Sequence, residues 1–195
     1  MTNFDVYTPA TAPEKSRPLL GLWQEKMGFV PNAVGIMAES PALLKGFAEM
    51  RDAYEKGLFS PVERAVIHMT VSGLNGSAYC IAAKSACCEK SGIPKDVVDA
   101  LREERPMKDP KLEALRAFIM SVMKKMGRTD QRDLDAFYKA GYSKAHVMEA
   151  ILGVSLGTIG NYVSHIARPQ LDKPFEPHRI DLGKKKPDAR SSHAA

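Results

Sequence analysis

Apolar side chains recur every three or four positions along most of the chain, which is the spacing of one face of an α-helix. No stretch alternates apolar and polar residues for long enough to predict a strand. Glycine and proline interrupt the helical pattern at short intervals. The sequence therefore predicts an all-α protein, a bundle of about eight to nine helices.

Serine followed by proline marks the start of two predicted helices. Ser40-Pro41 opens an apolar stretch that Gly57 ends, and Ser60-Pro61 opens one that runs to about residue 72. A serine side chain can accept a hydrogen bond from the first turn, and proline at the first helical position gives up no hydrogen bond there. Glu63 follows Ser60 by three residues, the spacing of a capping box.

The remaining helices are predicted from the same periodicity. Gly28 should end the first of them, and Asn32 should cap the second. Their approximate ranges are 19–27, 32–37, 77–90, 95–102, 110–126, 130–139 and 143–166.

The chain divides into an N-terminal arm, one helical domain and a C-terminal arm. Residues 1–14 are predicted to be extended, and residues 15–172 to form the domain, with 59–102 at its centre. Pro169, Pro174 and Pro177 should exclude regular structure, so 173–195 is predicted to be an arm and tail. The tail after residue 183 holds four basic residues and one acid, +3 of the net charge of +5, and is expected to be solvated.

Two glycine-rich segments suggest an internal repeat. Gly73-Leu-Asn-Gly76 follows Val-Ser and precedes Tyr79, and Gly157-Thr-Ile-Gly160 follows Val-Ser and precedes Tyr162. Each was interpreted as a junction between helices. A weak two-fold repeat and a chance likeness are equally compatible with this pattern.

Composition excludes several classes of protein. The N-terminus lacks the basic and apolar regions of a secretory signal, and no apolar run approaches the roughly 18 residues of a membrane helix. No basic helix interleaved with aromatics argues for nucleic acid. The three cysteines lie together between Cys80 and Cys88, which is not a disulfide framework and predicts a reducing, cytoplasmic location.

The segment from Phe59 to Lys84 resembles the signature of the carboxymuconolactone decarboxylase family, and especially its alkylhydroperoxidase D-like branch. Further likenesses extend the resemblance over about residues 28–172. Within the segment the matching residues are Ser60, Pro61, Glu63, Arg64, Val71, Ser72, Asn75, Gly76, Tyr79 and Cys80. The resemblance implies a helical fold, assembly into homotrimers or hexamers, and thiol-dependent reduction of peroxides.

Several of the residues that carry this chemistry in active relatives are replaced here. The resemblance places Ala65 where relatives have a second glutamate, Ser77 where they have the first cysteine, and Lys84 where they have a histidine. Cys80 alone remains. Ser77 cannot form a disulfide, so the two-cysteine cycle that the resemblance implies cannot run. Natural divergence explains all three changes better than one engineered Cys-to-Ser change.

The remaining cysteines do not restore the pair. Cys87 is seven residues beyond Cys80 on one predicted helix, a separation of about 10 Å between Cα atoms, whereas a disulfide needs roughly 4.4–6.8 Å. Cys87 and Cys88 are therefore interpreted as packing residues. Cys80 itself lies in the first turn of a helix, with Lys84 one turn on and Ser77 three residues before, and these neighbours favour a thiolate. A buried, inert remnant is the alternative interpretation.

Four further residues are candidates for the site. His68 could supply a base near position 65, although a lone histidine on an apolar helix is more often structural. Tyr79, Asn161 and His165 could line a pocket or support it, the last two from one side of a single helix because they are four residues apart. No cysteine and histidine spacing predicts a metal site, and no glycine-rich loop predicts a nucleotide cofactor.

Three functions follow from these residues. The first is a one-cysteine thiol peroxidase in which Cys80 attacks a peroxide and an external thiol regenerates it, with Lys84, Ser77 and His68 in support. The second is a catalytically degenerate relative that keeps the fold for binding or structure. The third, a decarboxylating lyase of lactones, has no cluster of acid and base residues in its favour. No cofactor is expected.

Overall fold

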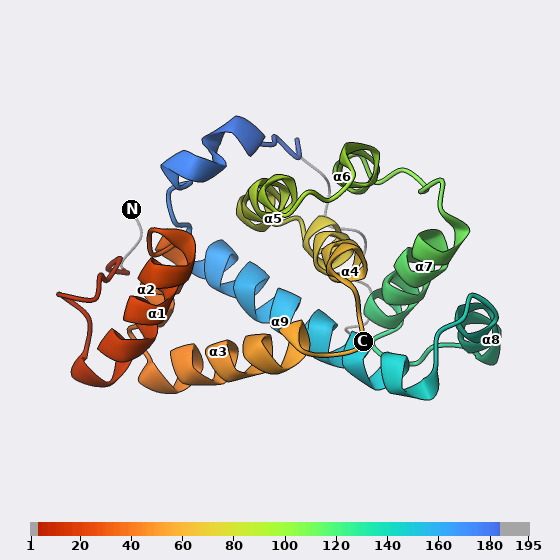
Figure 1. The fold of residues 1–195 in the computed structure, drawn as a ribbon, viewed down its shortest axis with the longest axis horizontal. Coiled ribbons are helices and arrows are strands. Elements are labelled where there is room, and N and C mark those ends of the chain that lie inside the picture. Colours follow the sequence, from red (N-terminus) through yellow and green to blue (C-terminus); the bar gives the residue numbers. More distant parts are fainter. Residues whose placement is uncertain (1–3, 184–195) are drawn as a thin grey trace, which may run out of the picture.

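Nine α-helices and two short 3₁₀ helices make up the regular structure of residues 4–183, the part of the chain that the computed structural model describes (Figure 1). This confirms the predicted all-α fold. The predicted basic tail lies outside these residues. In chain order the elements are η1 (Glu14–Ser16), α1 (Arg17–Met27), α2 (Asn32–Met37), α3 (Pro41–Glu55), α4 (Pro61–Leu74), α5 (Ala78–Lys90), α6 (Lys95–Arg102), α7 (Pro110–Lys124), α8 (Gln131–Lys139), α9 (Lys144–Ala167) and η2 (Lys173–His178).

Helices α4 and α9 organise the bundle. α4 packs against α5, α6, α7 and α9, and α9 packs against α2, α3, α4, α5 and α7. Figure 1 shows α9 as a long diagonal that runs from α8 towards the N-terminal helices. α9 is long and apolar enough, by length and composition, to cross a membrane. It also packs against five other helices, which makes it the central helix of the bundle.

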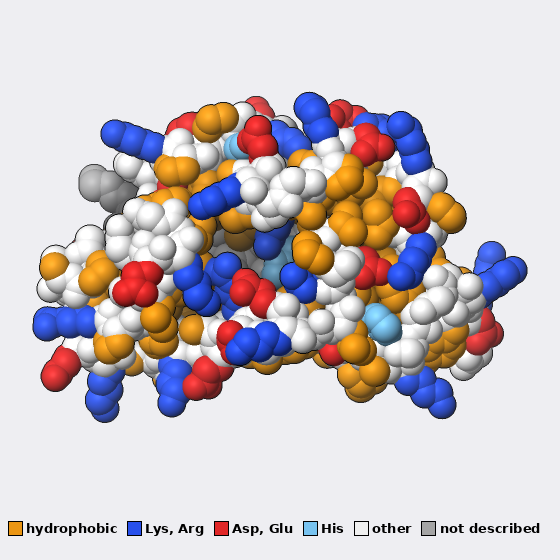
Figure 2. All heavy atoms as spheres, in the orientation of Figure 1, with side chains coloured by type: hydrophobic (Ala, Val, Ile, Leu, Met, Phe, Trp, Pro, Cys, Tyr) orange, Lys and Arg blue, Asp and Glu red, His pale blue; other side chains and the backbone are white. Residues whose placement is uncertain are grey.

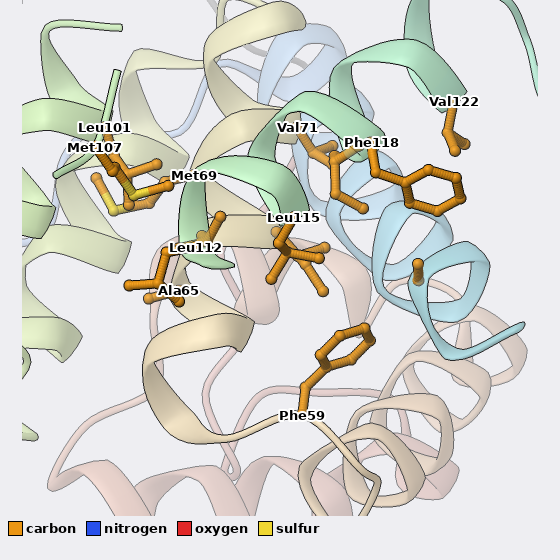
Figure 3. Close-up of a cluster of buried hydrophobic side chains, with 14 of the residues drawn as sticks. Phe59, Ala65, Met69, Val71, Leu101, Met107, Leu112, Leu115, Phe118 and Val122 are labelled. Carbon is orange, nitrogen blue, oxygen red and sulfur yellow. The ribbon is translucent and has the colours of Figure 1, made fainter. Parts of the chain in front are cut away.

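The larger core cluster lies between α4 and α7. Figure 3 shows Ala65 of α4 beside Leu112 of α7, with Leu115 and Phe118 further along α7 and Phe59 just before α4. All five side chains are buried. Burial of each large apolar side chain contributes about 1.5–3 kcal/mol, so this interface stabilises α4, the helix that leads to Cys80.

A second core cluster joins the N-terminal segments to α3. Leu20, Met37 and Leu44 are buried in it, and the Ser16 hydroxyl donates a buried hydrogen bond of 2.8 Å to the carbonyl of Ala38. Residues 4–13 form no helix, and Ala12 is buried in this cluster. The N-terminal arm is thus held against the domain.

The predicted start signals of α3 and α4 are confirmed. The Ser40 hydroxyl accepts a hydrogen bond from the backbone N–H of Leu43 at 3.3 Å. Ser60 and Glu63 form the predicted capping box, with the carboxylate 2.8 Å from the backbone nitrogen of Ser60. These local devices fix where α4 begins and therefore which of its faces meets α7.

Asn32 does not cap α2, contrary to the prediction. It is the first helical residue, and its backbone N–H donates to the carboxylate of Asp172 at 2.9 Å. Its side-chain amide donates to the carbonyl of Gln170 at 3.0 Å. The cap is supplied by a residue 140 positions away, which no local pattern in the sequence can reveal.

Two predictions about glycine and proline are wrong. Gly157 and Gly160 lie within α9, which continues without a break, so the second half of the suggested repeat is not a helix junction. Prolines do not exclude regular structure after residue 172, because η2 forms there and packs against α5. Phe175 of η2 is buried. The C-terminal segment up to residue 183 is thus part of the packed structure.

Candidate active site around Cys80

The junction between α4 and α5 places Cys80 at the start of a helix, as predicted. Gly76 adopts a left-handed conformation with φ of 68°, which reverses the chain after α4. The Ser77 hydroxyl then caps α5 by accepting a hydrogen bond from the backbone N–H of Cys80 at 3.4 Å. Cys80 therefore lies in the first turn, where free backbone N–H groups favour negative charge.

Ser77 is a buried partner of α9 and makes no hydrogen bond to the sulfur. Its hydroxyl lies 2.9 Å from the hydroxyl of Ser164, which donates to the carbonyl of Asn161 at 2.8 Å. Ser164 also lies 3.8 Å from the sulfur of Cys80. Sequence analysis missed Ser164, because only the crossing of α5 and α9 brings residues 84 positions apart together.

A cavity of about 160 Å³ opens beside Cys80. Figure 2 shows a hollow near the middle of one face, with hydrophobic side chains around it and basic and histidine side chains inside it. Apolar residues from six elements form most of its walls, and Gly160 leaves open space beside the sulfur, since a Cβ there would lie 3.9 Å from it. The cavity is lined by Trp23, Met27, Pro31, Ala33, Val34, Met37, Phe47, Arg51, His68, Ser72, Tyr79, Cys80, Ala83, Lys84, Cys87, Leu156, Gly157, Gly160, Asn161 and Phe175.

His68 lies in this cavity and is neutral at pH 7. Burial lowers the pKa of His68 well below 6.5, and the charges of Lys84, Arg51 and Arg64 lower it further. Its ring stacks on that of Tyr54 with 5.2 Å between centroids. Its Nε2 is buried and has no hydrogen-bond partner within the described residues.

Ala65, the position of the replaced carboxylate, lies elsewhere. It is packed in the α4–α7 core and is not among the residues that line the cavity. The expectation that His68 shares its face is therefore not met, although the two are one turn apart. His68 rather than residue 65 provides the titratable group of α4 in the cavity.

Lys84 and Cys87 line the same cavity from α5. Within residues 4–183 the ammonium group of Lys84 has no hydrogen bond or ion pair, so no described group pairs with its charge. Cys88 points away into the core, where burial raises the pKa of its thiol to about 11. Cys88 is thus protonated at neutral pH, consistent with its interpretation as a packing residue.

Tyr79 supports the site. Its hydroxyl donates to the carboxylate of Asp172 at 2.6 Å and accepts from the backbone N–H of Ala33 at 3.2 Å. Burial and the nearby Asp172 raise the pKa of Tyr79, so it stays protonated. Its ring meets Phe175 edge-on. Tyr79 therefore ties α5 to α2 and to the C-terminal segment, and all three contribute walls of the cavity.

Asn161 and His165, predicted to share one side of α9, have different surroundings. Asn161 is buried and lines the cavity, and its amide donates to the Ser72 hydroxyl at 3.1 Å and accepts from Asn75 at 3.0 Å. His165 is exposed and does not line the cavity. The structure assigns Asn161 a role in joining α9 to α4 and separates His165 from the site.

Residues 4–183 contain no cluster of three or more histidine, cysteine, aspartate or glutamate side chains that could hold a metal ion. The chemical groups of the residues that line the cavity include a thiol at a helix start, a neutral imidazole, a guanidinium and an unpaired ammonium.

Solved structures with this arrangement of helices include proteins described as peroxidase-related. No protein-family model and no curated protein matches the chain. An uncharacterized peroxidase-related protein of Ralstonia eutropha JMP134, described as an alkylhydroperoxidase AhpD core, has a TM-score of 0.80 and 21% identity over 92% of this chain and 97% of its own. An uncharacterized peroxidase-related protein of Silicibacter sp. TM1040 has a TM-score of 0.75 and 18% identity over 89% and 93%.

A third similar structure is the debrominase Bmp8 without ligand. It has a TM-score of 0.77 and 18% identity, and the match covers 91% of this chain and 96% of its own. A cysteine-to-alanine variant of Bmp8 has been solved with 2,3,4-tribromopyrrole. The matches span nearly the whole of each chain, so they show that these proteins share one fold.

Proposed function

We propose that this protein, which has the alkylhydroperoxidase D-like fold, reduces hydroperoxides through the single thiol of Cys80. The observation that carries the proposal is the position of the sulfur, in the first turn of α5 and beside a cavity that also holds His68. Ser77 occupies the place of a second cysteine, so the sulfur has no partner for an internal disulfide. An external thiol is therefore the proposed reductant.

The proposed reaction uses the sulfur of Cys80 and two external thiols. The Cys80 thiolate attacks the outer oxygen of a hydroperoxide; the S–O bond forms as the O–O bond breaks, and the leaving alkoxide takes a proton to become an alcohol. Neutral His68 can take the thiol proton and return it to that alkoxide. One external thiol then displaces water from the sulfenic acid and forms a mixed disulfide with Cys80. A second external thiol attacks this mixed disulfide, which frees the Cys80 thiol and leaves a disulfide between the two external thiols.

The direct test is the oxidation state of Cys80 after treatment with a hydroperoxide. We expect a sulfenic acid at Cys80, trapped with a dimedone probe and located by peptide mapping. Turnover with cumene hydroperoxide and dithiothreitol should be lost in Cys80→Ser and retained in Cys87→Ser, which changes a second cysteine of the same cavity. No adduct at Cys80 and unchanged turnover in Cys80→Ser would contradict the proposal.

The second candidate is a non-catalytic relative that keeps the fold for binding. Position 65 is buried in the core and Ser77 is bonded to Ser164, so neither remnant of the two-cysteine site is available for chemistry. A cavity without activity would then be a binding site. The peroxide experiment separates the two candidates, because a binding protein would give neither turnover nor a sulfenic acid.

A brominated aromatic compound should be tested as a substrate in the same assay, because one protein of this fold is a debrominase. The apolar walls of the cavity could accept such a ring. Lactone decarboxylation remains the weakest candidate.

We further propose a cytoplasmic location, since three free cysteines are typical of a reducing compartment.

A further inference from the structure

Two cationic side chains, Arg51 and Lys84, line the Cys80 cavity. None of the described residues that line it is aspartate or glutamate. Arg51 forms an ion pair with Glu55 at 2.7 Å and stacks over the Trp23 ring, 4.1 Å from its centroid. The ammonium of Lys84 has no such partner in the described part of the chain.

The state of His68 is a second sign of this charge. Among the causes that lower the pKa of His68, the charges of Lys84, Arg51 and Arg64 follow burial. The same positive potential that opposes a proton on the ring attracts an anion. In addition, the buried Nε2 of His68 lacks a hydrogen-bond partner among the described residues.

The rest of the cavity is apolar and narrow. Trp23, Met37, Phe47, Leu156 and Phe175 supply large hydrophobic surfaces, and the volume of about 160 Å³ suits a body of the size of one substituted ring. A neutral apolar ligand would leave Lys84 desolvated and unpaired, which is costly. An anion without an apolar body would leave the hydrophobic walls uncovered.

We propose that this cavity binds small organic carboxylates, the apolar body against Trp23 and Phe47 and the carboxylate at Lys84, and that the hydroperoxides reduced at Cys80 carry such a carboxylate. The choice of substrate rests on the proposed peroxidase function, whereas the binding of the anion does not. Lys84 thereby acts as a specificity residue as well as a neighbour of the sulfur.

The binding of the anion is testable with the natural fluorophore of the site. Trp23 is the sole tryptophan and lines the cavity. We expect benzoate to change its emission with saturation and the uncharged isostere benzamide to bind about tenfold more weakly. Lys84→Met should remove the preference for benzoate. Lys90→Met, which removes an exposed lysine of the same helix, is the matched control and should preserve it.

Alkylation of Cys80 gives an independent measure of the positive electrostatic potential in the cavity. Iodoacetate and iodoacetamide attack the same thiolate, so the ratio of their rates cancels any effect of Lys84 on the amount of thiolate. The ratio at Cys80 should exceed that of glutathione in the wild type and in Lys90→Met, and fall to the glutathione value in Lys84→Met. Equal binding of benzoate and benzamide, together with a ratio that Lys84→Met leaves unchanged, would overturn the proposal.

The substrate class is tested by a pair of hydroperoxides. Turnover of cumene hydroperoxide should fall below that of its para-carboxylate derivative in kcat/KM, and Lys84→Met should abolish the difference. Equal kcat/KM values for the two in the wild type would overturn the substrate assignment. Absence of any turnover alongside benzoate binding would instead refute the peroxidase function and leave a carboxylate-binding site.

Discussion

The hydroxyl of Ser77 occupies the place at which a second thiol would complete a Cys-x-x-Cys pair with Cys80. The Ser77 side chain is buried and its hydroxyl is hydrogen-bonded to Ser164, so this position is packed and has almost no contact with solvent. Whether the sulfur of Cys80 works alone or with a partner is thus decided by one side-chain atom at position 77.

Replacement of Ser77 by cysteine should restore an internal disulfide. Residues 77 and 80 are three apart at a helix start, a spacing that falls within the range a disulfide spans. After treatment with one equivalent of peroxide, we expect mass spectrometry to show loss of two hydrogens in Ser77→Cys and none in the wild type. Loss of the serine cap should lower stability by about 1 kcal/mol. Accumulation of sulfenic acid without a disulfide in the variant would show that the two sites cannot meet.

At the scale of the element, the capping box of α4 predicts how stability responds to acid. Burial raises the pKa of Glu63, but hydrogen bonds from Ser60, Lys111 and Tyr142 outweigh it, and the pKa is lowered below 4.5. The stabilisation from the ionised group is therefore present above pH 4.5 and lost as the pH falls through the lower folded value.

Glu63→Gln should lower the free energy of unfolding at pH 7 by about 1–3 kcal/mol, because charged hydrogen bonds are lost. The difference from the wild type should shrink as the pH falls below 4.5, and urea denaturation across that range measures it. Glu49→Gln changes a glutamate whose side chain is 68% exposed and should have little effect at any pH. A difference that is constant with pH would contradict the assignment.

The surroundings of two glycines, one on α9 and one on α3, predict how an added methyl group changes the stability of the protein. A Cβ at Gly153 would lie 2.6 Å from the hydroxyl oxygen of Tyr54, so Gly153→Ala should destabilise the protein by about 1–3 kcal/mol. Gly46 of α3 has nothing within 4 Å of such a Cβ, and Gly46→Ala should raise stability by up to about 1 kcal/mol. Thermal unfolding of the pair checks both signs; a stabilised Gly153→Ala would mean that α9 can move away.

An interaction can be predicted from this sequence when its two residues are close together along the chain. Ser60 and Glu63 cap a helix through bonds between neighbours, and such signals were recognisable. Gly157 and Gly160 look like a junction but serve the close packing of α9, which the sequence pattern does not express. Ser164 and Asp172 contact the site from more than 80 positions away. Cys80, Lys84 and His68 could be predicted as cavity residues, whereas the partners that position them could not.

For the whole molecule, an apolar stripe on α9 is the feature left without a partner within the described chain. Met148, Ile151, Tyr162 and Ile166 are 48–70% exposed, and their spacing places them along one side of the helix. Large contiguous apolar surfaces commonly mark subunit contacts. We propose that this stripe joins copies of the chain into the homotrimer or hexamer that the sequence resemblance implies.

Light scattering of the purified protein should therefore give a multiple of the 21.4 kDa chain mass. The double variant Ile151→Asp/Ile166→Asp should give the monomer mass, because charges would be buried at the contact. Met126→Asp alters a side chain that is 75% exposed in the turn after α7 and should leave the assembly intact. A monomeric wild type, or a double variant that still assembles, would refute the role of the stripe.

The Tyr79–Asp172–Asn32 hydrogen bonds have a consequence for biosynthesis. The ribosome completes the α4–α7 core long before it has translated Asp172 and Phe175, yet both contribute to closing the chamber around the sulfur. In a nascent polypeptide the walls around the Cys80 sulfur are therefore incomplete until residues 172–175 have emerged and η2 has packed against α5.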